Sequence, residues 1–113
     1  MTAERIQRRL DDLARIGQEA AYVVAKGRLD YLADTMEGAL LRNAGERILI
    51  KAATVTEKLP DDLKVQHPEV DWTGINRMRN LVAHHYDKVN DDLLWTALSV
   101  RIPRLVKDLG IQR

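Results

Sequence analysis

One short segment of the chain carries most of the side chains that are capable of chemistry. Arg77-Met78-Arg79-Asn80-Leu81-Val82-Ala83-His84-His85-Tyr86 places a permanent cation, an amide, two imidazoles and a phenol close together. An imidazole, with a pKa of about 6.5, takes the proton from a ribose 2′-OH or returns one to the leaving oxygen. An arginine binds a phosphate and stabilises the charge that develops on it. The segment therefore predicts metal-independent RNA cleavage, with Arg79 and His84 as the catalytic residues.

Two neighbouring residues are candidates for supporting roles. Asn80 lies four residues before His84, so the two share one face of a helix, where Asn80 can orient the imidazole or bind the substrate. Tyr86 can position a phosphate or stack on a base. Arg79 and His84 are separated by five residues, or about 140° around a helix, and so converge only if the helix loosens or two chains meet. This spacing indicates a second protomer.

Other kinds of catalytic site are not indicated by the sequence. It has no glycine-rich phosphate loop, nucleophile elbow or metalloprotease helix motif. His84 and His85 are adjacent and point to different sides of a helix, while His67 stands alone beside Pro68. We therefore expect no metal site and no cofactor.

Apolar residues recur at helical spacing through most of the chain and predict the elements that must position this segment. The first helix spans residues 6–24, with Thr2 as its N-cap and Gly27 after its end. The second spans residues 29–59, and a loop leads from it to Asp71, which caps the third. Asn90-Asp91-Asp92 marks the start of the fourth, which Pro103 kinks or ends near residue 102.

These elements define one fold class. No stretch alternates with the period of a strand, and 113 residues suffice for one domain, 1–113. We expect an all-α protein, a small antiparallel helical bundle of four main helices with the last one kinked or broken at Pro103. Trp72 and Trp95 are expected as core or interface anchors.

Composition limits the functions that such a bundle can have. With 18 basic against 17 acidic residues, the net charge of +1 argues against a broad polyanion binder, so any contact with nucleic acid must be local. The absence of Cys excludes disulfides and thiol nucleophiles. No apolar run approaches the roughly 20 residues of a membrane span and no signal-peptide pattern opens the chain, so we expect a cytoplasmic protein with no membrane partner.

The motif and its context resemble a known family. Arg79-x4-His84-x-Tyr86 is similar to the R-x4–6-H-x-Y signature of HEPN-domain ribonucleases, and above all of the HepT toxins of HEPN/MNT (type VII) toxin–antitoxin systems. Further stretches resemble that family in order and spacing: Val70-Asp71-Trp72, Met78-Arg79-Asn80-Leu81-Val82, the two acids before Leu93-Leu94-Trp95, and Ile102-Pro103-x-Leu105. The chain departs from the family near the end of its second helix, where Ala53-Thr54-Val55 replaces a Gly-Glu-Ala-like step with an acidic residue.

The resemblance implies a fold, an activity and a partner. It implies a HEPN-like helical domain that forms a homodimer, in which the two motif segments meet as a composite, metal-independent endoribonuclease site. It also implies a toxin whose cognate MNT-type nucleotidyltransferase antitoxin inhibits it by AMPylation of Tyr86. An anionic nucleotide beside Arg79 and His84 would occupy the place that an RNA phosphate needs.

Several alternatives remain open at this point. The chain can be a non-catalytic HEPN module that binds a nucleotide or a partner and docks a nucleotidyltransferase, or a purely structural helical dimer. Arg79 can form a surface ion pair with Asp87 or another acid. A set of basic residues can form either an RNA-guiding surface or an ordinary solvated face: Arg5, Arg8, Arg9, Arg101 and Arg104.

Overall fold

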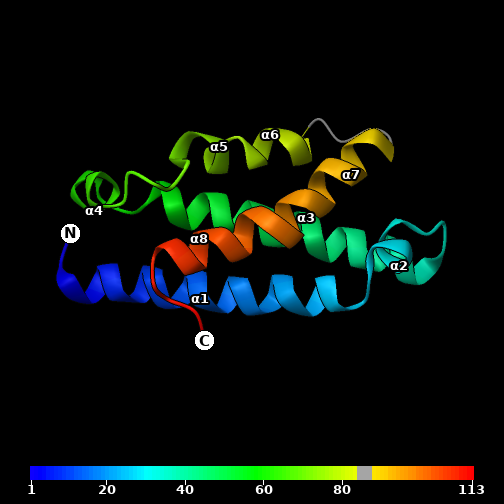
Figure 1. Ribbon diagram of the computed structural model, residues 1–113, viewed down its shortest axis with the longest axis horizontal. Helices are drawn as coiled ribbons and strands as arrows, with labels where there is room; N and C mark the ends of the chain where they lie inside the picture. Colours follow the sequence, from blue (N-terminus) through cyan, green and yellow to red (C-terminus); the bar gives the residue numbers. More distant parts are fainter. Residues whose placement is uncertain (84–87) are drawn as a thin grey trace.

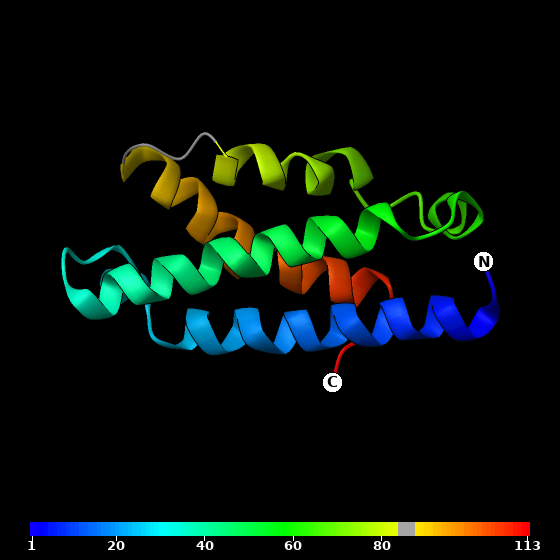
Figure 2. The same cartoon turned by 180° about the vertical axis from the view of Figure 1, so that it is seen from behind.

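Two long antiparallel helices, α1 (Ala3–Ala25) and α3 (Met36–Glu57), lie side by side in the computed structural model, which describes residues 1–83 and 88–113 (Figures 1 and 2). Local signals in the sequence set their ends. The hydroxyl of Thr2 accepts a hydrogen bond from the backbone N–H of Arg5 at 3.2 Å, which confirms the predicted N-cap. Gly27 follows α1 with a φ of 94°, a backbone conformation that favours glycine.

The second predicted helix, residues 29–59, is wrong as a single element because it is broken near its start. Arg28–Leu32 forms the short helix α2, and α3 begins only after Thr35, whose hydroxyl accepts from the N–H of Gly38 at 3.0 Å. Nη1 of Arg42 donates to the carbonyl oxygens of Tyr31 and Ala33, at 2.8 Å each. The guanidinium thus satisfies carbonyls that the break leaves without helical partners.

The chain after α3 forms three short helices. α4 (Asp61–Gln66) occupies part of the region that was predicted to be a loop. The third predicted helix starts where expected, because the Asp71 carboxylate caps the N–H of Gly74 at 2.9 Å. It is divided into α5 (Trp72–Asn76) and α6 (Met78–Ala83), which follow α3 on its outer side (Figures 1 and 2).

The last part of the chain crosses the α1–α3 pair on the side seen in Figure 1. α7 (Lys88–Thr96) continues into the π-helical turn η1 (Ala97–Arg101) and then into α8 (Ile102–Asp108). Asn90, which was predicted to mark the start of this helix, lies within α7. The irregularity predicted at Pro103 takes the form of η1, because a proline ring clashes with the carbonyl four residues earlier and a wider turn avoids that contact.

A single aliphatic core joins these helices. Leu13, Leu49, Met78, Leu94 and Leu98 come from five different elements and are at most 1% exposed. Trp72 and Trp95 pack against this core while remaining partly exposed, as expected for anchors. Over the described residues the all-α bundle prediction is confirmed, with α1, α3, the α5–α6 pair and the α7–η1–α8 run as its four main parts. None of its described helices is long and apolar enough to cross a membrane.

Candidate functional site

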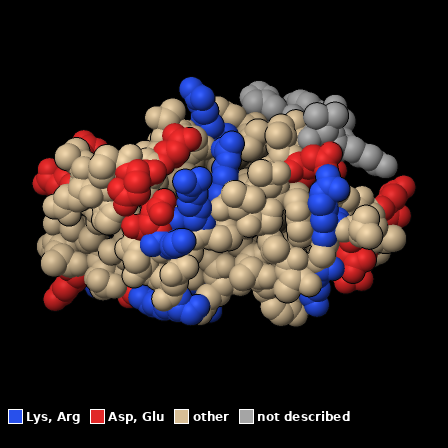
Figure 3. Space-filling model, viewed as in Figure 1, with Lys and Arg blue, Asp and Glu red and all other residues tan. Residues whose placement is uncertain are grey.

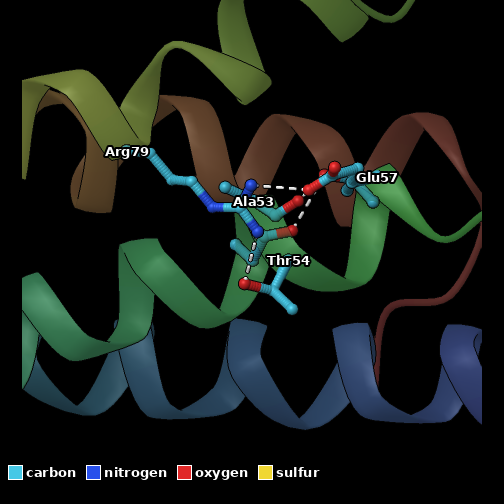
Figure 4. A network of polar contacts seen from close by, with 6 residues as sticks. Ala53, Thr54, Glu57 and Arg79 are labelled. Carbon is cyan, nitrogen blue, oxygen red and sulfur yellow. Dashed lines mark hydrogen bonds and ion pairs between the residues drawn. The ribbon is translucent and has the colours of Figure 1, made fainter.

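Arg79 reaches from α6 across the C-terminal part of α3 (Figure 4). Its Nη1 donates to Oε2 of Glu57 at 2.5 Å, and its Nη2 donates to Oγ1 of Thr54 at 2.7 Å. The side chains of Arg79 and Glu57 are 42% and 58% exposed, so water reaches the ion pair. Two directional contacts on different nitrogens fix the plane of the guanidinium while leaving part of it accessible.

Glu57 is a functional candidate that the sequence analysis missed. Ala53-Thr54-Val55 lacks an acid, and the acid that contacts Arg79 lies further along the helix, at Glu57. Thr54 and Glu57 are three residues apart in α3 and therefore share one helix face. That spacing was visible in the sequence, whereas the partner on α6 was not.

The position of Arg79 depends on its neighbours in α6. Met78 is fully buried in the core and anchors the helix against α3. Arg79 follows at about 100° around the helix axis, which brings it along the surface of α3. Asn80, one step further, is exposed. The structure therefore places Arg79 against α3 and leaves Asn80 open to solvent.

The other predicted site residues, His84 and Tyr86, lie outside the described residues, as do His85 and Asp87. The structure consequently gives the positions of only Arg79 and Asn80 from the predicted set. The partner of Arg79 within the described chain is an acid of α3, which corresponds to the alternative of an ion pair with another acid.

His67 lies apart from this site, after α4. Its Nδ1 is 3.2 Å from Oε1 of Glu69. The pKa of Glu69 is lowered, first by a hydrogen bond from its own backbone N–H and then by His67. Within residues 1–83 and 88–113, no three His, Asp or Glu side chains gather closely enough to hold a metal ion.

On the face shown in Figure 3, basic side chains lie beside acidic ones. Arg101 and Arg104 line a cleft of about 400 Å³ between α5 and the η1–α8 run, and Glu69, Asp71 and Asp108 line the same cleft. The carboxylates outnumber the guanidinium groups, so this cleft is poorly suited to a polyanion.

Comparisons with known proteins bear on this chain as a whole. The model of a protein family described as "Ribonuclease HepT-like" matches residues 4–109. A protein of Caldanaerobacter subterraneus that carries a provisional RNase name is 27% identical over 97 residues, which cover 86% of this chain and 87% of that protein.

Two archaeal proteins match over shorter stretches. A protein of Methanocaldococcus jannaschii with a provisional RNase name is 30% identical over 53 residues, 47% of this chain and 44% of that protein. One of Thermococcus cleftensis, named a probable ribonuclease HepT, is 36% identical over 50 residues, 44% of this chain and 46% of that protein. The chain thus spans less than half the length of these two relatives. No solved structure matches it.

Proposed function

The chain belongs to the HepT-like ribonuclease family, and from that premise we propose that it is an RNA-cleaving toxin neutralised by a nucleotidyltransferase antitoxin. The observation that carries the proposal is the orientation of Arg79 by Glu57 and Thr54. A guanidinium has five N–H donors, and two of them are used in these contacts. The remaining donors and the exposed part of the group are suited to bind a phosphate.

In the proposed reaction, His84 takes the proton from a ribose 2′-OH, and the 2′-oxygen attacks the adjacent phosphorus. The bond between phosphorus and the 5′-oxygen breaks, and the leaving oxygen accepts the proton that the imidazole returns. The products are a 2′,3′-cyclic phosphate and a 5′-OH. Arg79 binds the non-bridging phosphate oxygens and stabilises their growing charge. Asn80 and Tyr86 support the imidazole and the substrate.

We place this site at a homodimer interface. The spacing of Arg79 and His84 separates them by about 140° on one helix, so a second copy is the simplest source of a converging partner. Each protomer then contributes to a composite site.

The proposed antitoxin acts on the same segment by transferring AMP from ATP to the hydroxyl oxygen of Tyr86, with release of pyrophosphate. That residue is only two positions from His84 in the sequence. The anionic nucleotide would compete with RNA phosphate for Arg79. The intact mass of the protein, after coexpression with a nucleotidyltransferase encoded beside it, should rise by whole AMP units, and Tyr86→Phe should abolish the increase.

Cleavage of a labelled single-stranded RNA by purified protein tests the proposed activity. Arg79→Ala and His84→Ala should each lower the rate by about 100-fold or more, since removal of one group that stabilises transition-state charge has an effect of that size. Lys58→Ala, an exposed cation beside Glu57, is the matched control and should stay within about threefold of the original rate. Full activity of the folded His84→Ala protein would instead favour the non-catalytic binding module.

A further inference from the structure

A groove between α1 and α3 extends from the candidate site toward the other end of the helix pair. We propose that this groove binds single-stranded RNA beyond the cleaved phosphate, with Arg15 and Arg47 contacting phosphates and Tyr22 stacking on a base. This inference rests on the proposed ribonuclease function and adds a substrate-binding surface to it.

The groove is continuous with the Arg79 site. Two adjoining hollows of about 470 Å³ and 340 Å³ share Glu19, Arg47 and Lys51 as lining residues. The larger one includes Thr54, whose hydroxyl accepts from Arg79 at 2.7 Å and which lies on the side of α3 that faces α1 (Figure 4). The smaller one ends at Tyr22 and Ala44. Ten residues of α3 separate Ala44 from Thr54, a length of about 15 Å.

The groove has more basic than acidic side chains in its lining. Arg15, Arg47 and Lys51 line it together with the acids Asp12 and Glu19. Nζ of Lys51 lies 2.5 Å from Oε1 of Glu19, so these two charges neutralise each other. Arg15 and Arg47 are exposed, and in the part of the chain that the structure describes neither forms an ion pair.

The balance of charge is reversed in the cleft between α5 and the η1–α8 run, where acidic side chains outnumber basic ones. There, two arginines face three carboxylates, whereas in the groove three cations face two. Charge complementarity therefore favours the α1–α3 groove as the path of a polyanion, and disfavours the RNA-guiding surface built around Arg101 and Arg104.

An exposed aromatic ring lies at the far end of the groove. Tyr22 is 67% exposed, and Nζ of Lys26 lies 4.9 Å from its ring centroid. A basic groove combined with an aromatic platform is the arrangement that binds single strands without strong sequence preference, because cations follow the backbone and bases stack on the ring. The position of Tyr22 next to the basic groove therefore fits a single-stranded occupant.

The test measures binding separately from cleavage. His84→Ala protein, which holds the RNA intact, is titrated with a fluorescent 12-nucleotide single-stranded RNA and followed by anisotropy. Adding Arg15→Ala and Arg47→Ala together should raise Kd at least about tenfold. The slope of log Kd against the logarithm of the salt concentration should fall by about 1.4, or about 0.7 for each phosphate contact that is lost. Tyr22→Leu should raise Kd about 5- to 100-fold without changing the salt dependence, whereas Tyr22→Phe should keep the affinity.

A matched control removes the same charge from the other face. Arg101→Ala with Arg104→Ala should leave Kd within about twofold. In the cleaving protein, the groove substitutions should reduce kcat/KM on the 12-nucleotide RNA but not on a dinucleotide, which reaches only the Arg79 site.

The outcomes separate this inference from the proposed function. Cleavage that depends on His84, with RNA affinity unaffected by the groove substitutions, would overturn the groove and leave the ribonuclease in place. Absence of any RNA cleavage by the original protein would overturn the proposed function. Weakened binding of the nucleotidyltransferase with unchanged RNA affinity would show that the groove docks a protein instead.

Discussion

The α1–α3 pair and the α5–α6 segment differ in what stabilises them. α1 and α3 have 23 and 22 residues, and each buries a face along its length. α5 has only 5 residues and the described part of α6 has 6, lengths at which an isolated helix is unstable in water, whereas α7 continues into η1 and α8. The short helices therefore depend on caps and on contacts with α3, and the candidate catalytic arginine is placed by the long helix it touches. The long helices form the scaffold on which the site is built.

The strongest way to break the scaffold is to open a cavity in α3. Leu49 is fully buried at its centre, so Leu49→Ala should lower the free energy of unfolding by about 2–5 kcal/mol. Leu40→Ala, on the same helix but 60% exposed, should cost less than about 1 kcal/mol. Urea denaturation of both variants checks this. Equal losses would mean that α3 does not supply the core.

Replacement of Tyr31, on α2, should raise the free energy of unfolding instead of lowering it. It is fully buried against Trp95, with ring centroids 5.2 Å apart, and its hydroxyl has no hydrogen-bond partner within the described chain. A carbon built on Gly45 would lie 2.8 Å from that oxygen, so the hydroxyl is tightly enclosed. Tyr31→Phe removes an unsatisfied polar group and should raise the free energy of unfolding by about 1 kcal/mol. Denaturation at pH 7 measures it, and a loss of stability would point to a partner for the hydroxyl.

The difference in stability between Tyr31→Phe and the original protein should also depend on pH. Burial raises the pKa of the Tyr31 phenol, and the carboxylates of Asp91 and Glu46 raise it further. The folded state therefore keeps the proton after the unfolded chain begins to lose it near pH 10, and this contribution to stability is lost as the pH rises above about 10. The difference in stability between Tyr31→Phe and the original protein should widen above pH 10. A constant difference would contradict the raised pKa.

Local signals made much of the scaffold predictable from the sequence. Thr2, Gly27 and Asp71 act within three residues of themselves, and all three were located correctly. The break between α2 and α3 was not foreseen, because it relies on Arg42 reaching carbonyls 9 and 11 residues earlier. A pattern of apolar spacing cannot register a contact of that kind.

The candidate site also combines a feature that the sequence indicates with one that depends on packing. Residue types within one segment made Arg79 a candidate and indicated its chemistry, since that inference needs only neighbours in the sequence. Its ion pair with Glu57 spans 22 residues and exists only because α6 packs on α3. The type of a functional group is therefore readable from the sequence, whereas its partner is a property of the packing.

Removal of the cap of a short helix should have a smaller effect on the free energy of unfolding than a cavity in the core. Asp71→Ala removes the acceptor for the Gly74 N–H and should cost about 1 kcal/mol. Hydrogen exchange at the amides of α5 should accelerate, while exchange in α1 stays unchanged. Asp61→Ala is the control, because Asp61 lies in the first turn of α4 and Pro60 occupies the cap position there. Faster exchange throughout α1 would show that the two regions unfold together.

The smallest effect on stability is expected where the two regions meet. Glu57→Gln keeps the shape of the side chain and removes its charge from an exposed pair, so the free energy of unfolding should change by less than about 1 kcal/mol. Cleavage should respond more strongly, because the amide holds the Arg79 guanidinium less firmly and kcat should fall about tenfold. KM for RNA should fall or stay constant, since a negative charge beside the bound phosphate has been removed.

This split between kcat and KM distinguishes orientation from competition. If Glu57 only competes with RNA phosphate for Arg79, its replacement should raise kcat/KM without lowering kcat. Thr54→Val removes the second contact without altering charge, and should lower kcat with no change in the salt dependence of KM. A fall in kcat in both variants would mean that α3 contributes to the site by orienting the arginine of α6. The long helix would then act in catalysis as a positioning element, although neither of its two residues need touch the RNA.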